Sequence, residues 1–146
     1  MSEIRQKIVN EAYSWIGTPY HHRARVKGGG VDCAQLLAAV YGDCGLIADT
    51  VDENYPMDWH LHRDEERYLK RVKRHAHKVT EPLPGDIALF KFGRVISHGA
   101  IVTEWPFIIH AYRPEHSCCM SDVSKSAELT DRLVGFYRLD QLEEEA

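Results

Sequence analysis

Apolar residues near the start of the chain recur at helical spacing: Ile4, Ile8, Ala12 and Trp15. Gly17 follows as a stop signal, so the pattern predicts an amphipathic helix over residues 4–16. Residues 17–30 are predicted to form a loop, because the Thr18–Pro19 pair and three consecutive glycines, Gly28–Gly30, interrupt regular structure.

A second helical pattern begins at Asp32, which is a good N-cap residue, and continues through Tyr41 to a stop near Gly42 or Gly45. This segment is apolar on nearly every side, which predicts a buried central helix. Residues 49–59 read as irregular. Residues 61–72 read as a surface helix, whose basic and acidic side chains alternate as on a solvated face.

The second half of the chain changes character. A turn at 82–85 is followed by apolar, β-rich segments, with Gly93 and Trp105–Pro106 supplying two of the connections. The predicted strands are Asp86–Phe92, His98–Thr103, Phe107–Ala111 and Leu133–Leu139. Helices followed by antiparallel strands predict an α+β domain, and no repeat or linker divides residues 1–146 into two.

Composition and charge narrow the function. The chain has 146 residues with a formal net charge of -4, which gives no general attraction to nucleic acid. We find neither a signal-peptide pattern nor an apolar run of about 20 residues, so we expect synthesis in the cytoplasm and no membrane insertion. Nine histidines invite a metal hypothesis, but no pair has the spacing of a closed zinc site, so we expect no metal and no cofactor.

Cys33 is the strongest candidate for chemistry among four cysteines. It follows a likely N-cap and should lie in the first turn of the buried helix, where unpaired N–H groups and the helix dipole favour a thiolate. The same N–H groups can stabilise an oxyanion, and the glycines upstream would let a substrate backbone approach. The alternative is that Cys33 is a small buried apolar residue.

Two histidines are candidates for the base that a thiol nucleophile needs. His98 begins the predicted strand His98–Thr103, and His110 lies near the end of the next predicted strand, Phe107–Ala111. Counting outward from a hairpin turn at Glu104–Pro106 places the two rings as cross-strand neighbours. One imidazole can then accept the thiol proton while the other orients it. The alternative for each histidine alone is a structural or surface role.

Five short motifs, in order, resemble those of the NlpC-type cell-wall peptidases, which have a papain-like fold. They are Gly17–Tyr20, Gly29–Cys33, Pro82–Asp86, Ser97–Val102 and Phe107–Ala111. The resemblance implies a cysteine peptidase that cleaves peptidoglycan stem peptides, commonly between D-glutamate and a diamino acid. It departs from the family's pattern after the cysteine, where Ala34 and Gln35 replace the usual serine and glycine.

The resemblance also implies roles for single residues. Cys33 matches the nucleophile, His98 the base and His110 the third, polar member of the triad. Tyr20 matches a tyrosine beside the cysteine that helps the oxyanion. Asp32 matches an acidic residue that in some members binds a substrate amine, and its role as an N-cap is compatible with that.

Other functions stay open from the sequence. The same fold and triad serve acyltransferases and amidases, and a structural tail-assembly protein could carry a vestigial site. A compact domain without an export signal resembles peptidases encoded with phage or prophage tail genes, so we expect peptidoglycan peptides and phage tail proteins as partners, and the virion tail or the cell wall as the place of action. Arg23, Arg25 and Lys27 could meet a substrate carboxylate, although a solvated loop explains them equally.

Overall fold

A computed structural model describes residues 2–47 and 67–145 of the chain. Its central element is a six-stranded antiparallel sheet with the strand order β3-β8-β4-β5-β6-β7. The strands are β3 (Ala76–Val79), β4 (Ile87–Phe92), β5 (Val95–Glu104), β6 (Phe107–Tyr112), β7 (Ser117–Asp122) and β8 (Leu133–Leu139). A separate small sheet pairs β1 (Arg25–Val26) with β2 (Gly30–Val31).

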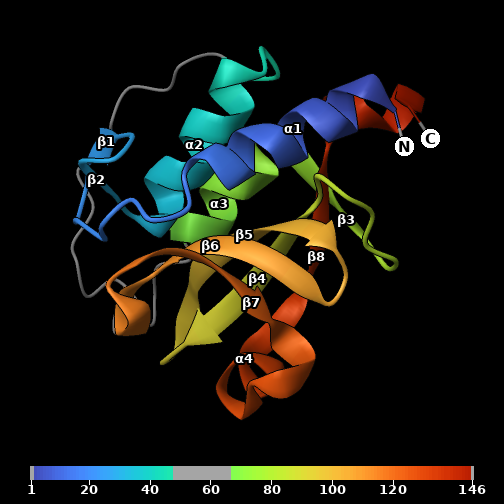
Figure 1. Cartoon of the computed structure of the whole chain (residues 1–146). Coiled ribbons are helices and arrows are strands. Elements are labelled where there is room, and N and C mark those ends of the chain that lie inside the picture. The colour runs from blue at the N-terminus through green and yellow to red at the C-terminus, as the bar shows by residue number, and fades with distance from the viewer. Residues whose placement is uncertain (1, 48–66, 146) are drawn as a thin grey trace.

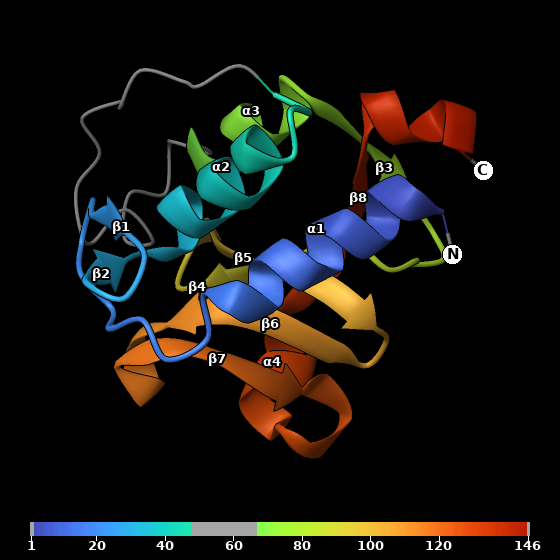
Figure 2. The ribbon, with the colours of Figure 1, turned by 45° about the horizontal axis from the view of Figure 1, so that its top comes forward.

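Helices cover both faces of the large sheet (Figures 1 and 2). Three of them lie on one face: α1 (Glu3–Ser14), α2 (Cys33–Asp43) and α3 (Arg67–Lys73). The short helix α4 (Ala127–Arg132) lies on the other. Short 3-10 turns η2 (Arg113–Glu115), η3 (Val123–Lys125) and η4 (Asp140–Glu145) complete the described chain. None of the described helices combines the length and apolarity needed to cross a bilayer.

The core is double, because the central strands are buried on both sides. Ile101 of β5 and Ile109 of β6 pack towards α1 and α2. Their sequence neighbours Val102 and Ile108 face the opposite way and pack with Leu129 of α4. Helices packed on an antiparallel sheet confirm the α+β architecture that the sequence predicts.

Both N-terminal helices begin where the sequence places them. The Ser2 side chain accepts a hydrogen bond from the backbone N–H of Arg5 and caps α1. Asp32 caps α2 in the same way, and every residue of α2 from Cys33 to Tyr41 is buried. The Tyr41 hydroxyl donates to the carbonyl of Gly85 at 2.7 Å, which fixes α2 against the turn before β4.

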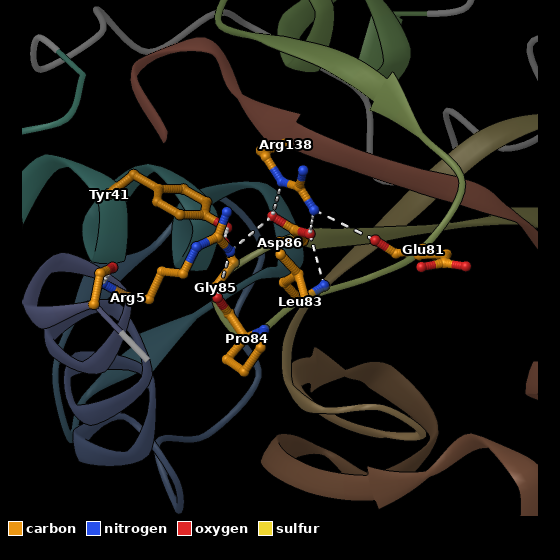
Figure 3. Close-up of polar contacts among 9 residues, drawn as sticks. Arg5, Tyr41, Glu81, Leu83, Pro84, Gly85, Asp86 and Arg138 are labelled. Atoms are coloured by element: carbon orange, nitrogen blue, oxygen red, sulfur yellow. Dashed lines mark hydrogen bonds and ion pairs between the residues drawn. The ribbon is translucent and has the colours of Figure 1, made fainter. Parts of the chain in front are cut away.

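Asp86, at the end of the Pro82–Asp86 motif, joins three parts of the chain (Figure 3). Its fully buried carboxylate forms ion pairs with Arg5 of α1 at 3.2 Å and with Arg138 of β8 at 2.8 Å. It also accepts the backbone N–H of Leu83 at 2.8 Å, which closes the turn. A buried carboxylate needs such partners, so this motif has a structural role.

The structure corrects several sequence predictions. The helix expected over 61–72 is described from Arg67 and ends at Lys73, and strand β3, which the sequence did not predict, follows it. The loop 17–30 contains the small β1–β2 hairpin. Strand β7 and helix α4 had no prediction, since β7 reads Ser-Cys-Cys-Met-Ser-Asp and lacks apolar alternation. The prediction for 49–59 lies outside the described residues.

Candidate active site

Cys33 occupies the first turn of α2, as predicted, with 4% of its surface exposed. Asp32 holds this turn with both carboxylate oxygens. One accepts the backbone N–H of Gln35 at 2.9 Å, and the other accepts that of Arg23 at 2.7 Å. The Cys33 thiol donates to the carbonyl of Ser97 at 3.6 Å, which places the sulfur beside the residue that precedes His98.

The two predicted histidines meet. The Nε2 atom of His98 on β5 lies 2.8 Å from the Nδ1 atom of His110 on β6, and both side chains are buried. The Nε2 atom of His110 lies in turn 2.8 Å from the hydroxyl of Ser121 on β7. Three neighbouring strands therefore carry a continuous hydrogen-bonded line from His98 to Ser121.

The register of the hairpin differs from the one counted from the sequence. Ile101 pairs with Ile109, and a bulge lies between Val102 and Glu104. The hairpin is thus centred on Trp105, the middle of the predicted turn. His98 lies seven residues before this centre and His110 five residues after it, so the two are diagonal neighbours and not the directly opposed pair that was expected. Their side chains still meet because both point to the same face of the sheet.

The hydrogen-bonded line fixes the tautomers that catalysis would need. If His98 Nδ1 is to accept a proton, Nε2 must carry the hydrogen and donate it to His110 Nδ1. His110 then donates from Nε2 to the hydroxyl oxygen of Ser121. In this arrangement each ring nitrogen of the two histidines is either a donor or an acceptor, and the lone pair of His98 Nδ1 remains available to accept a proton.

Aromatic rings hold the two imidazoles in place. The Phe90 and Phe92 rings lie 5.7 Å and 5.6 Å from the His98 ring. Tyr112 stacks on the His110 ring at 4.5 Å and 16°. The Tyr112 hydroxyl donates a hydrogen bond to Glu128 of α4, so α4 supports the site from the second face of the sheet. Rings locked in this way keep their orientation without help from a substrate.

Cys33 and His98 open onto one cavity of about 590 Å³. Tyr20, the predicted oxyanion residue, lines the same cavity. Asp32 does not line it, is 2% exposed, and uses its two oxygens on backbone N–H groups. Its capping role is therefore clear in the structure, and its role towards a substrate amine stays a prediction.

Burial sets the charge state of the site. Burial, followed by the negative charge of Asp32, raises the pKa of the Cys33 thiol to about 12. Hydrogen bonds from Tyr68 and from backbone N–H groups act in the opposite direction and do not compensate. Burial alone lowers the pKa of His98 to about 3. The resting site therefore holds a thiol and a neutral imidazole.

This corrects the expectation of a thiolate at the helix N-terminus. Hydrogen bonds from backbone N–H groups do lower the pKa of Cys33, but loss of water around the sulfur and the charge of Asp32 outweigh them. The same physical cause raises the pKa of Tyr20, helped by nearby Cys33 and Asp32, so its phenol stays protonated as a hydrogen-bond donor. The charge of Arg113 opposes that rise.

The loop before Cys33 is hydrogen-bonded to α2, and its glycines serve the conformation of the loop itself. Gly28 has a positive φ of 81°, and a Cβ at Gly30 would meet the Cβ of His21 at 2.8 Å. None of the three glycines lines the cavity, so they do not admit a substrate backbone there. Arg25 donates to the side chain of Gln35 at 2.7 Å, and Lys27 donates to Glu11 at 2.9 Å. Arg25 and Lys27 thus bind the protein's own residues.

Sequence reasoning missed several residues of the site. Ser121 ends the line from His98, but it lies in a polar strand with no signal in its spacing. Tyr68 of α3 donates to the Cys33 carbonyl at 3.3 Å. Arg113 and Arg132 line the cavity although they lie far from Cys33 in sequence. Only the pairing of strands and the packing of α3 and α4 bring these side chains together.

Searches with protein-family models and among curated proteins gave no match. A lipoprotein-like NLP/P60-family protein from Staphylococcus aureus has a similar structure, with a TM-score of 0.68 and 22% identity over 95% of this chain and 42% of that one. The chain thus spans about two fifths of that protein's length.

Two isolated domains match over nearly their whole length. The NlpC/p60 domain of the peptidoglycan hydrolase SagA has a TM-score of 0.59 and 22% identity over 91% of this chain and 96% of that one. RipD from Mycobacterium tuberculosis, a non-catalytic NlpC/p60 domain protein adapted to peptidoglycan binding, has a TM-score of 0.58 and 13% identity over 94% and 97%. The chain has the NlpC/p60 fold, as its sequence motifs predict.

Proposed function

We propose that this protein is a cysteine peptidase that hydrolyses a peptide bond of peptidoglycan stem peptides. The observation that carries the proposal is the convergence of Cys33 and His98 on one cavity, with His98 hydrogen-bonded to His110. The fold supports it, since the similar SagA domain comes from a peptidoglycan hydrolase. By resemblance of the motifs, the bond is that between D-glutamate and a diamino acid.

The reaction begins from the neutral pair. As the Cys33 sulfur attacks the amide carbon, its proton passes to Nδ1 of His98, while the N–H of Cys33 and the Tyr20 hydroxyl stabilise the oxyanion. The protonated His98 gives that proton to the leaving amine, and a thioester forms. Water then attacks the thioester with His98 as base, which releases the carboxylate and restores the thiol.

His110 acts as a positioning residue in this scheme. The hydrogen bond from His98 Nε2 to His110 Nδ1 holds the base in the required tautomer. When His98 becomes positive, the lone pair of His110 and, behind it, the Ser121 hydroxyl stabilise that charge. A neutral third member does this less strongly than a carboxylate would, and it avoids burying a second charge.

The test uses defined muropeptides and mass spectrometry. The parent protein should release two fragments, and Cys33→Ala should lose at least about 1000-fold in rate, as loss of a covalent nucleophile does. Cys44→Ala, which removes a thiol at the other end of α2, is the matched control and should retain activity. Equal rates for the parent and Cys33→Ala would refute the mechanism.

A second candidate is peptidoglycan binding without catalysis, because one structural neighbour, RipD, is a non-catalytic domain. Retention of bound muropeptide with no fragment from the parent protein would favour it. An acyltransferase of the same fold would instead join the acyl fragment to an added amine. The products therefore separate all three functions in one experiment.

The proposal extends to delivery with a phage or prophage tail, or release to the cell wall. It is supported by the resemblance of the compact domain to tail-associated peptidases. Detection of the protein in purified virions would support tail delivery, and its confinement to the lysate outside virions would contradict it.

A further inference from the structure

Basic side chains gather around the proposed nucleophile. Arg113, His116 and Arg132 line the cavity of Cys33 and His98, and no acidic side chain lines it in the part of the chain that the structure describes. The whole chain has a net charge of -4, so this cavity is a local exception. A concave, positively charged site attracts anionic groups and strengthens their binding as water leaves.

Arg132 is held in the cavity by an aromatic ring. Its guanidinium carbon lies 4.9 Å from the centre of the Phe92 ring, and Phe92 contacts the ring of His98 edge-on. Stacking keeps the planar face occupied and leaves the N–H edge available to a ligand. Arg132 therefore presents hydrogen-bond donors one aromatic ring away from the catalytic base.

One hydrogen-bond donor of Arg132 has no acceptor among the described residues. This donor is the buried Nε atom. This N–H is enclosed by the protein, so a ligand in the cavity would contact the other donors of the half-buried Arg132 side chain. Glu128, one helical turn earlier, accepts a hydrogen bond from the Tyr112 hydroxyl.

Arg113 supplies a second cation on a different part of the wall. It begins the η2 turn directly after β6 and is exposed, and its charge reaches Tyr20. The side chains that the sequence offered for a carboxylate, Arg25 and Lys27, bind Gln35 and Glu11 instead. The cations available to a substrate carboxylate in this cavity are therefore Arg113, which follows β6, and Arg132, which ends α4.

We infer that Arg132 and Arg113 bind carboxylate groups of the substrate, so that the cavity selects peptides with a free carboxylate beside the cleaved amide. This inference rests on the proposed peptidase site and names the chemical feature by which that site selects its substrate. A neutral lipid amide, the substrate of an acyltransferase of this fold, has no group for these two cations. Arginine is suited to the role because its planar fork matches both oxygens of a carboxylate.

The test measures binding apart from cleavage. The ligands are two γ-glutamyl peptides, one with a free α-carboxylate and one with that group as a carboxamide, titrated calorimetrically into Cys33→Ala protein. The carboxylate form should bind about 10- to 100-fold more tightly, as expected for a charge-assisted hydrogen bond in a desolvated site. Added Arg132→Gln or Arg113→Gln should reduce this preference, and Arg132→Lys should retain part of it.

Lys125→Gln is the matched control, because it removes an exposed cation close to α4 that does not line the cavity. It should keep the full preference. Equal binding of the two peptides, or binding of neither, would overturn the inference, and so would a preference that survives in both arginine variants. Parent protein that cleaves both peptides equally would refute the inference and leave the peptidase intact. Selective binding of the carboxylate peptide without cleavage by the parent protein would support the inference and refute the peptidase function.

Discussion

Acidification should weaken this fold through the histidines of the site. His98 and His110 are buried, and burial lowers the pKa of His98 to about 3 and that of His110 well below its usual value. In an unfolded chain both imidazoles titrate near pH 6.5. The unfolded state therefore binds protons that the folded state excludes. Stability is present in full above about pH 6.5 and falls as the pH drops towards 3.

The size of the effect follows from His98 alone. At pH 5 an imidazole with a pKa of about 6.5 is almost wholly protonated in the unfolded chain, which lowers the free energy of that state by about 2 kcal/mol. At pH 7 the same contribution is about 0.2 kcal/mol. His98 should thus remove about 2 kcal/mol of stability between pH 7 and pH 5. His110 acts in the same direction.

The assay is urea unfolding at pH 7, 6 and 5, followed by tryptophan fluorescence, on the parent and on His98→Gln. The other titrating groups contribute to both proteins, so the loss of stability on acidification should be smaller by about 2 kcal/mol in His98→Gln. His21→Gln, which removes an exposed histidine, should behave as the parent. The same loss in the parent and in His98→Gln would mean that the folded protein protonates His98, and would refute the reasoning.

Three further predictions concern the surroundings of the site. Asp86→Ala should cost about 3 to 5 kcal/mol in urea unfolding, because it leaves two arginines without their buried counter-ion. Ser121→Ala should lower kcat about 10-fold with little change in KM, since it removes the acceptor of His110, and Ser121→Thr should restore most of the rate. Gly99→Ala should destabilise by about 1 to 3 kcal/mol, measured as a lower urea midpoint, because its Cβ would meet the Tyr68 hydroxyl at 2.5 Å; an unchanged midpoint would contradict this.

The parts of the fold that local chemistry determines could be predicted from the sequence. Asp32 caps α2 and Cys33 stands in its first turn because a cap needs only a short polar side chain and the N–H groups three residues on. Strand β8 runs from Leu133 to Leu139 as predicted. Such signals lie within a few residues of the element they determine.

The parts that depend on distant pairing could not be predicted. Strand β7 exists because β6 offers its free edge, and its own residues lack an apolar alternation. The sequence therefore did not predict that Ser121 of β7, or Arg132 at the end of α4, belongs to the site. The register that aligns His98 with His110 also depends on a bulge between Val102 and Glu104, and no residue of the turn predicts that bulge.

The protonation state of Cys33 shows why its position in the helix is not enough to predict its pKa. A helix N-terminus lowers a thiol pKa when water also surrounds the sulfur, but Cys33 is buried and lies near Asp32. The helix therefore contributes most when a developing oxyanion, not a resting thiolate, faces its N–H groups. A carboxylate-bearing substrate that enters the cavity adds further negative charge, which disfavours a thiolate and favours an imidazolium at His98. Transfer of the proton from sulfur to His98 should therefore coincide with attack, so that charge is never left on the sulfur alone.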